Sequence, residues 1–189
     1  MPELTFLPLI PERWSDFVAL FGPRGAYGGC WCMWWRSTRA EFQAQQGDGN
    51  RRAMHDIVHD GEVPGILAYV GEEPVGWCSV APRQHFGSLN RSPVLRPLDD
   101  RPVWSLVCLF VGRDYRGQEV ALNLIRAAVE YAGAQGASIV EAYPTVPRKD
   151  GKLPPVSSFM GVPAMYEQAG FVECARPSRS RMIMRYVVP

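Results

Sequence analysis

The sequence contains no long apolar run and no excess of charge of either sign. Its apolar segments fall short of the ~20 residues that a membrane-spanning helix requires. The N-terminal residues MPELTFLPLIPERW include acidic side chains, whereas a secretory signal begins with basic ones. Twenty basic and nineteen acidic residues give a formal net charge of +1, which argues against nucleic-acid binding because that function requires a concentrated basic surface. We therefore expect a cytoplasmic protein that binds neither nucleic acid nor a membrane.

Metal-binding patterns are also missing. The pair Cys30 and Cys32 has no second pair to complete a zinc site, whose paired ligands normally lie about two to four residues apart. His55 and His59 share a predicted helix face, but the residue after His55 is not the glutamate of a metalloprotease helix. We predict no metal site and expect most cysteines to be reduced and buried. A redox or metal-sensing role for the cysteine pair stays open as an alternative.

What the sequence does contain is enough apolar material for one core. With 189 residues, of which 47% are hydrophobic, the chain is predicted to form a single domain over residues 1–189. Apolar and β-branched runs predict strands, and apolar side chains at three- and four-residue spacing predict helices. The predicted strands cover residues 4–10, 65–70, 74–80, 103–111, 137–143, 171–175 and 181–188, and the predicted helices cover residues 12–21, 51–59, 119–136 and 163–170.

The stretch over residues 103–136 organises the rest of the chain. An apolar strand pattern is followed by a polar turn, residues 112–118, and then by a helical pattern. The first N–H groups of such a helix lack partners within the chain and lie at the positive end of its dipole, so they favour an anion. Arg113 and Arg116 add full positive charges at the same place. This arrangement predicts a phosphate-binding loop, and the ligand it suggests is coenzyme A.

Residues 30–36, CWCMWWR, hold three tryptophans, two cysteines and an arginine. One interpretation is a hydrophobic plug between a helix and the sheet. The other is a wall of the acceptor pocket, because aromatic side chains favour small-molecule sites. Residues 81–102 and 144–159 are long segments without clear periodicity. Loops of that length in a single domain are usually lids or binding loops.

Two motifs lie in the second half of the chain. The first is Leu109-Phe110-Val111 followed by residues 113–121, RDYRGQEVA, and the second is residues 165–171, MYEQAGF, a helical segment ending in Gly-Phe. In this order, and with these elements around them, they resemble the GNAT superfamily of N-acetyltransferases. Members of that superfamily move an acyl group from acyl-coenzyme A to an acceptor, usually an amine.

The resemblance implies that the first motif binds the pyrophosphate of coenzyme A. The family's loop runs Arg or Gln, two residues, Gly, one residue, then Gly or Ala, and Arg116 and Ala121 fit its ends. Glu119 stands where the family usually has the inner glycine, which permits close approach of phosphate. We expect its carboxylate to point to solvent and to complement the helix dipole. The predicted donor is acetyl-coenzyme A, and the predicted cofactor-binding residues are Leu109, Phe110, Val111, Arg116, Gly117, Gln118, Glu119, Val120 and Ala121.

The second motif places Tyr166 where many family members have a general acid. Core packing of this tyrosine is the alternative. Members often have an asparagine seven residues earlier that hydrogen-bonds the pantetheine arm. Phe159 occupies that position here, and Ser157 or Ser158 is the candidate replacement.

The fold implied is α/β and layered, with one mixed, mostly antiparallel sheet of about six to seven strands and helices on both faces. The strand carrying Leu109 would splay from the parallel strand at residues 139–143, with the pantetheine arm between them like an added strand. A backbone N–H near residues 109–111 would polarise the thioester carbonyl. The acceptor amine would attack directly, and Tyr166 would protonate the thiolate.

The proton acceptor is open between Glu141, His85 and a water chain. We predict Glu141 as the catalytic base, although the favoured interpretation of its position is an outward-facing strand residue. An acyl-enzyme on Cys108 is disfavoured, because a nucleophilic cysteine needs a base or a positive neighbourhood and no histidine is placed near it.

The acceptor is predicted to be a small-molecule amine, bound by Trp31, Trp34, Trp35 and Arg83. Arg36 and Arg96 are further candidates to pair with a substrate carboxylate. The alternative function is an acyl-coenzyme A-binding module with weak catalysis. The sequence leaves the oligomeric state open, a homodimer included.

Overall fold

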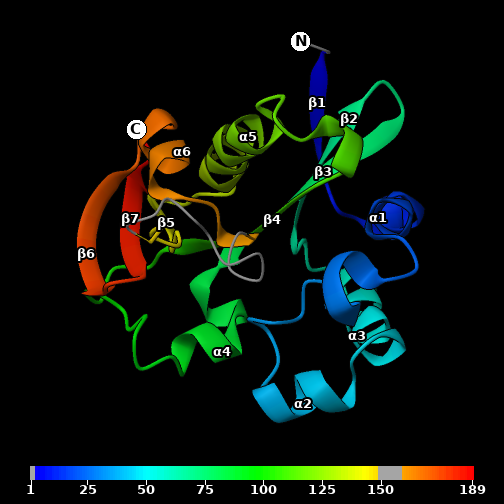
Figure 1. The fold of residues 1–189 in the computed structure, drawn as a ribbon, viewed down its shortest axis with the longest axis horizontal. Coiled ribbons are helices and arrows are strands. Elements are labelled where there is room, and N and C mark those ends of the chain that lie inside the picture. Colours follow the sequence, from blue (N-terminus) through cyan, green and yellow to red (C-terminus); the bar gives the residue numbers. More distant parts are fainter. Residues whose placement is uncertain (1–2, 149–158) are drawn as a thin grey trace.

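A computed structural model describes residues 3–148 and 159–189. Seven strands form one sheet in the order β1-β2-β3-β4-β5-β7-β6, with helices on both faces (Figure 1). Every neighbouring pair is antiparallel except β4 and β5, which are parallel. The predicted mixed, mostly antiparallel sheet is therefore confirmed. The strands are β1 Leu4–Pro8, β2 Gly65–Val70, β3 Glu73–Pro82, β4 Trp104–Val111, β5 Ile139–Ala142, β6 Val172–Ser178 and β7 Arg181–Val187. The helices are α1 Trp14–Phe21, α2 Arg39–Ala44, α3 Asp48–His59, α4 Gly87–Asn90, α5 Val120–Ala134 and α6 Pro163–Gln168.

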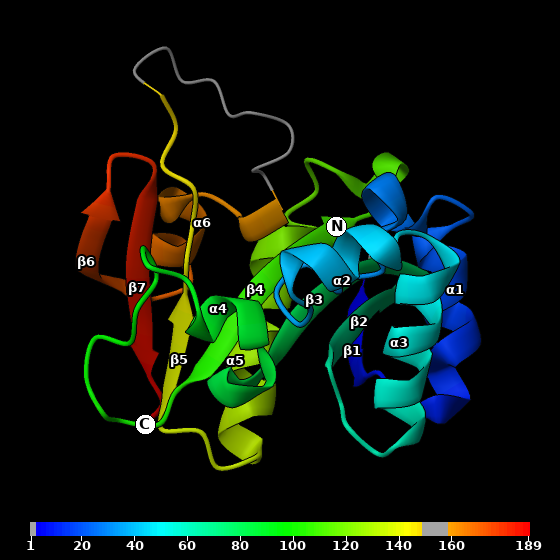
Figure 2. The ribbon, with the colours of Figure 1, turned by 90° about the horizontal axis from the view of Figure 1, so that it is seen from below.

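Alternation along the strands separates the core into two layers. On β2, Ile66 and Ala68 pack with the apolar face of α5, whereas Leu67 and Tyr69 pack with α1 and α3. Successive side chains of a strand point to opposite faces, so one apolar run serves both layers. Figures 1 and 2 show α5 and α6 on one side of the sheet and α1, α2 and α3 on the other.

The sheet opens in its middle. The parallel register between β4 and β5 covers only Trp104–Leu106 against Val140–Ala142. Beyond it, β4 runs on to Val111 while paired with β3, and Figure 2 shows β4 turning away from β5. A bulge accompanies the divergence, because Cys108 pairs with Ser79 but Leu106 pairs with Val80. An extra residue of this kind bends a strand and increases its twist. The predicted splaying of these strands is present.

Three helices differ most from the sequence prediction. α3 begins at Asp48, before the predicted residue 51, and neither α2 nor the short α4 was predicted. α2 begins with a capping box, in which Thr38 Oγ1 accepts from the Glu41 N–H and the Glu41 carboxylate accepts from the Thr38 N–H. This reciprocal pair satisfies two of the amides that a helix start leaves free. Within the described ranges, no helix is both long and apolar enough to cross a bilayer.

Candidate active site

The loop between β4 and α5 adopts two left-handed backbone positions in quick succession. Gly117 has φ +77° and Glu119 has φ +59°, and α5 starts at the next residue, Val120. Glu119 is exposed and its side chain makes no capping hydrogen bond. The first N–H groups of α5 have no carbonyl of an earlier helical turn to bond. They are therefore available to an anion, and the expectation that Glu119 faces solvent is met.

Arg116 is held at the end of β4. Its Nε donates to the Val111 carbonyl at 3.1 Å, and the side chain forms part of a cavity wall. Gln118 is tied back to the same turn, because its Nε2 donates to the Asp114 carbonyl at 2.9 Å. The loop thus places one guanidinium between the open strand edge and the positive end of α5.

A cavity of about 820 Å³ lies along the diverging part of β4. β4 lines it with the four residues from Cys108 to Val111, and the opposite wall comes from residues 21–46. Phe159 and Arg181 close a further side. Among the described residues that line it, none is aspartate, glutamate or histidine. The site is therefore an apolar chamber with two arginines and several cysteines.

Residues 30–36 divide between the core and the wall of this cavity. Trp31 is buried, 4% exposed, and stacks on Phe21 in the core between the sheet and α1. Trp34 and Trp35 line the cavity instead. Trp31 lies against Gly25 and leaves no room for a side chain there, because an added Cβ would lie 2.4 Å from the indole nitrogen. Of the three predicted substrate-binding tryptophans, two reach the cavity and Trp31 does not.

The cavity tryptophans have distinct surroundings. Trp34 packs edge-on against Phe42 of α2, with ring centroids 5.1 Å apart. Trp35 Nε1 is buried and has no hydrogen-bond partner in the described part of the chain. A buried donor left unpaired costs about 1–3 kcal/mol, so such groups are expected to meet a ligand or a water molecule.

Tyr166 lies behind the cavity wall. It is fully buried, and its hydroxyl donates to the Met160 carbonyl at 3.0 Å. A Cβ on Gly161 would lie 3.0 Å from the Tyr166 ring and 3.3 Å from Leu109 Cδ1, so the tyrosine is a close neighbour of a cavity-lining residue. Burial, followed by the nearby thiols of Cys78 and Cys108, raises the pKa of Tyr166 well above its ordinary value.

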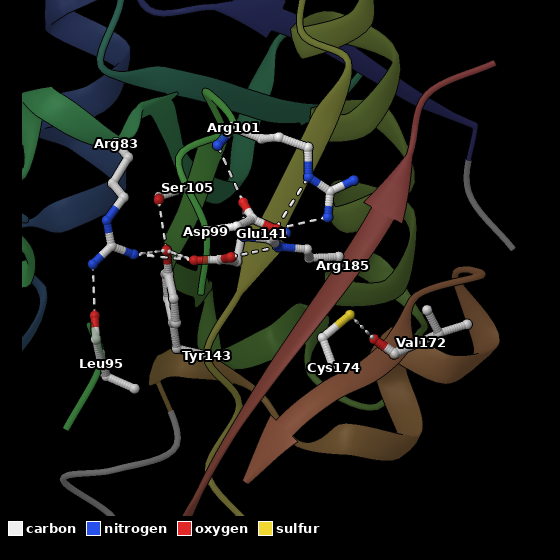
Figure 3. Close-up of polar contacts among 10 residues, drawn as sticks. All are labelled: Arg83, Leu95, Asp99, Arg101, Ser105, Glu141, Tyr143, Val172, Cys174 and Arg185. Atoms are coloured by element: carbon white, nitrogen blue, oxygen red, sulfur yellow. Dashed lines mark hydrogen bonds and ion pairs between the residues drawn. The ribbon is translucent and has the colours of Figure 1, made fainter. Parts of the chain in front are cut away.

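Glu141 does not face solvent, contrary to the favoured interpretation of its strand position. It is 0% exposed, and Arg83 Nη1 and the Tyr143 hydroxyl donate to its Oε1 at 3.0 and 2.7 Å. Arg185 Nε donates to its Oε2 at 2.7 Å. Figure 3 shows these side chains converging from the loop after β3, from β5 and from β7. The outward interpretation fails because β5 is a central strand between β4 and β7 and because the loop before β4, through Asp99 and Leu95, bonds the two arginines that hold Glu141.

The same network continues into the loop before β4. Arg185 donates to both oxygens of Asp99, at 2.7 and 3.2 Å, and Arg101 donates to Asp99 as well. Arg185, followed by Arg101, holds the pKa of the Asp99 carboxyl far below its usual range. Arg83 Nη2 donates to the Leu95 carbonyl at 2.6 Å. Arg83, predicted to bind substrate, is therefore engaged in fixing the loop and is not part of the cavity lining.

The remaining candidates lie away from the cavity or outside the described residues. His85 Nδ1 lies 2.9 Å from Glu62 Oε1, and Arg36 also pairs with Glu62. Arg96 is exposed. Ser157 and Ser158 are outside the described residues. No group of three or more His, Cys, Asp or Glu side chains in residues 3–148 and 159–189 is arranged to hold a metal ion.

Three of the five cysteines, Cys30, Cys32 and Cys108, line the cavity. Cys78 packs with α5 on the other face of the sheet. Trp77 Nε1 donates to Cys32 Sγ at 3.2 Å. All the cysteines are free thiols. From the sequence, Cys30 and Cys32 were considered for metal or redox chemistry and, within residues 30–36, as part of a plug or a pocket wall. Their meeting with Cys108 was not predicted, since nothing local links residue 32 to β4. Nor was it predicted that Phe42 and Arg181 line the cavity.

Comparison with known proteins agrees with this geometry. The model of the acetyltransferase (GNAT) family matches residues 31–150. A GCN5-related N-acetyltransferase from Kribbella flavida superposes with a TM-score of 0.51 at 15% identity, covering 91% of this chain and 33% of that one. A GNAT acetyltransferase from Streptococcus pneumoniae gives 0.57 at 15% identity, covering 99% and 100%.

PaiA N-acetyltransferase from Thermoplasma acidophilum, solved in complex with coenzyme A, gives a TM-score of 0.55 at 10% identity, covering 98% of this chain and 99% of that one. These likenesses show a shared fold. The chain spans about a third of the Kribbella flavida protein and nearly the whole of the other two. No curated protein sequence matches it. The family match covers more than half of the sequence, so the chain belongs to the GNAT family of acetyltransferases.

Proposed function

We propose that the chain transfers the acetyl group of acetyl-coenzyme A to the amine of a small, largely apolar acceptor by direct attack. The observation that carries the proposal is the continuity of one cavity with the open edge of β4 and with Arg116 at the start of α5. A thioester donor needs an anion site for its pyrophosphate, a slot for its arm and a chamber at its reactive end. These three features follow one another along β4.

The residues present fit the donor. The N–H groups in the first turn of α5, together with Arg116, would hold the pyrophosphate. The edge of β4 beyond Leu106 would pair with the pantetheine arm as an added strand does. A β4 N–H near Leu109 would polarise the thioester carbonyl, a contribution of about 3–4 kcal/mol by analogy with oxyanion holes.

Tyr166 is the proposed general acid for the departing thiolate. Its raised pKa keeps the hydroxyl protonated at neutral pH, and it neighbours Leu109 of the cavity wall. The demand on it is modest, because a thiol with a pKa of about 8.5 is a fair leaving group and an acid then contributes roughly a hundred-fold.

Glu141, the sequence candidate for the base, is proposed to organise the fold instead. Both of its oxygens already accept hydrogen bonds from cations or from Tyr143. For the acceptor we retain Trp34 and Trp35, because they line the cavity and Trp35 offers a free N–H. The aromatic lining favours an amine with an apolar or aromatic body.

Two variants test the donor site and the acid separately. Arg116→Ala is expected to raise the dissociation constant for coenzyme A several-fold by calorimetry, because it removes the charge between β4 and α5. Arg113→Ala, on the same turn, is the matched control and should change it less. An unchanged constant in Arg116→Ala would refute the phosphate site.

Tyr166→Phe is expected to lower kcat, measured as free-thiol release with a panel of amines, while leaving coenzyme A binding intact.

A second candidate is an acyl-coenzyme A-binding protein with little turnover. It is favoured by one observation: the Tyr166 hydroxyl is bonded to the Met160 carbonyl and does not line the cavity. Tight binding of coenzyme A with no thiol release from any amine would select it. Full activity in Tyr166→Phe would remove the tyrosine from the mechanism without affecting the proposed reaction.

A further inference from the structure

Direct attack by an amine requires a group that takes a proton from nitrogen, and the cavity offers few. Its described lining includes no carboxylate and no imidazole. Glu141 and His85 are engaged elsewhere, with Arg83 and Arg185 in one case and beside Glu62 in the other. The thiols of Cys30, Cys32 and Cys108 are therefore the side chains of the lining that can change protonation near neutral pH.

Cys32 is set apart from the other two by its hydrogen bonds. Trp77, fully buried beneath it, donates its indole N–H to Cys32 Sγ at 3.2 Å. Cys108 also interacts with this sulfur, and the Arg36 guanidinium contributes a favourable positive field. Donors gathered around a sulfur stabilise its thiolate form.

The backbone at this point is also unusual. Trp31 and Cys32 have φ of +45° and +58°, two left-handed residues in succession that are not glycine. Such positions cost of order 1–3 kcal/mol each and persist where the surroundings impose them, often at functional sites. Here the outcome is that Cys32 faces both the cavity and the Trp77 donor.

The groups around Cys32 determine how it titrates. Cys30 is partly buried and Cys78 is fully buried. Burial raises the pKa of Cys30 to about 11 and that of Cys78 well above its ordinary value. The hydrogen bond between Cys108 and Cys32 raises the pKa of Cys108. The same bond, together with the smaller effects of Trp77 and Arg36, outweighs burial and lowers the pKa of Cys32 to about 7. Cys32 thus ionises first, and its neighbours stay protonated.

We propose that Cys32, hydrogen-bonded by Trp77 and Cys108 in the wall of the acceptor cavity, is the general base of the acetyl transfer. The inference rests on the proposed function. The neutral amine attacks the thioester carbon, so a C–N bond forms and the C–S bond to coenzyme A breaks. The Cys32 thiolate takes one proton from the nitrogen. Coenzyme A leaves as a thiolate and takes up a second proton, from Tyr166. Cys32 then returns its proton to water.

A thiolate in this place also suits the acceptor. The other charged groups of the described lining are Arg116 and Arg181, both cations. The Cys32 thiolate would be the negative charge that draws an ammonium group into an otherwise apolar chamber. The nitrogen then gives its first proton to water before the attack and its second proton to Cys32. A base role is preferred to covalent catalysis, because a sulfur that is held by Trp77 and Cys108 would have to leave its donors to form a thioester.

The kinetic test compares Cys32→Ser with Cys30→Ser, using acetyl-coenzyme A with tryptamine and phenethylamine as probes. Cys32→Ser is expected to lower kcat by about a hundred-fold and to remove the fall in activity below pH about 7. Coenzyme A affinity and thermal unfolding should stay near those of the wild type. Cys30→Ser, in the same cavity, should keep the wild-type pH profile. Wild-type kcat and profile in Cys32→Ser would overturn the proposal.

A second measurement does not depend on turnover. Iodoacetamide labelling of the wild-type protein, mapped by peptide mass spectrometry across pH about 5–9, should give Cys32 a midpoint near 7, below the value of about 8.5 for an ordinary thiol. A Cys32 midpoint at about 8.5 or above, or no labelling of Cys32, would overturn the base role. So would an acetyl adduct on Cys32 after acetyl-coenzyme A alone, because that marks a nucleophile. Absence of thiol release by the wild type with any amine would instead refute the proposed function.

Discussion

At the scale of single residues, four non-glycine residues in the described ranges 3–148 and 159–189 adopt left-handed backbone conformations that normally belong to glycine. They are Ala26, Trp31, Cys32 and Glu119. For an L-residue this conformation costs about 1–2 kcal/mol. Ala26 and Cys32 line the cavity, Trp31 lies beside them, and Glu119 ends the loop at the start of α5. Backbone strain in this chain is therefore concentrated where the acetyl donor and acceptor are proposed to bind.

Glu119 gives the clearest test of that strain. Glu119→Gly is expected to stabilise the fold by about 1 kcal/mol, because glycine adopts φ +59° without a clash. This net value allows for the greater conformational entropy that glycine gives the unfolded chain. It should also tighten coenzyme A binding, since a carboxylate is removed beside the anion site. Urea unfolding and calorimetry measure the two effects.

The control for this prediction is Glu119→Gln, which removes the charge and keeps the strain. It should tighten binding without the gain in stability. Equal stability of Glu119→Gly and the wild type would show that the left-handed position is not a cost to this protein.

At the scale of elements, the central unit was predictable because its signals are local. The apolar run of β4, the turn with Gly117 and the helical spacing of α5 lie within one continuous stretch. The opening between β4 and β5 was predictable only through the family resemblance. Its physical basis, the bulge opposite Ser79 and the short parallel register, depends on residues distant in sequence.

α2 was missed although its start carries a local signal. Thr38 and Glu41 have the spacing of a capping box, but the helix they begin is only six residues long and has one buried side chain, Phe42. A single apolar residue gives no periodicity to detect. The consequence reaches the site, because Phe42 both lines the cavity and packs on Trp34.

Removing the cap should therefore affect both stability and the acceptor pocket. Thr38→Ala is expected to cost about 1 kcal/mol of unfolding free energy, since it takes away the oxygen that accepts the Glu41 N–H. It should raise KM for an aromatic amine by a larger factor than it changes kcat, because α2 positions Phe42 in the cavity where the acceptor is proposed to bind. Thr38→Ser, which restores the acceptor, should behave like the wild type. A loss of coenzyme A affinity instead would mean that α2 serves the donor.

At the scale of the whole molecule, one charged network joins segments that no local pattern connects. Arg83, Asp99, Glu141 and Arg185 come from two loop positions and two strands, and Arg185 and Asp99 are 86 residues apart. Because these pairings cannot be recognised from the sequence, Glu141 was predicted to be a base and Arg83 a substrate ligand. Each is a charged residue near a predicted site, and their partners become evident only in the fold.

The network fastens the loop of residues 83–102 to the sheet, so acid should release that loop first. Arg185 and Arg101 hold the pKa of Asp99 far below its ordinary value, while in the unfolded chain it returns to about 3.9. A carboxyl with a depressed folded pKa contributes stability that is complete above its unfolded pKa and is lost as pH falls toward its folded pKa. The contribution of Asp99 should therefore be constant above pH about 5 and decline below about 4.

Asp99→Asn tests this expectation directly. Its unfolding free energy should lie below that of the wild type at neutral pH, and the two urea-unfolding curves should converge as the pH is lowered below about 4. Glu173→Gln, which removes an exposed pairing with Arg176, is the control and should change stability little at any pH, because exposed ion pairs contribute about 0–1 kcal/mol. A gap between Asp99→Asn and the wild type that persists unchanged into acid would mean that Asp99 acts through its shape and hydrogen bonds. The network would then stabilise the loop without titrating.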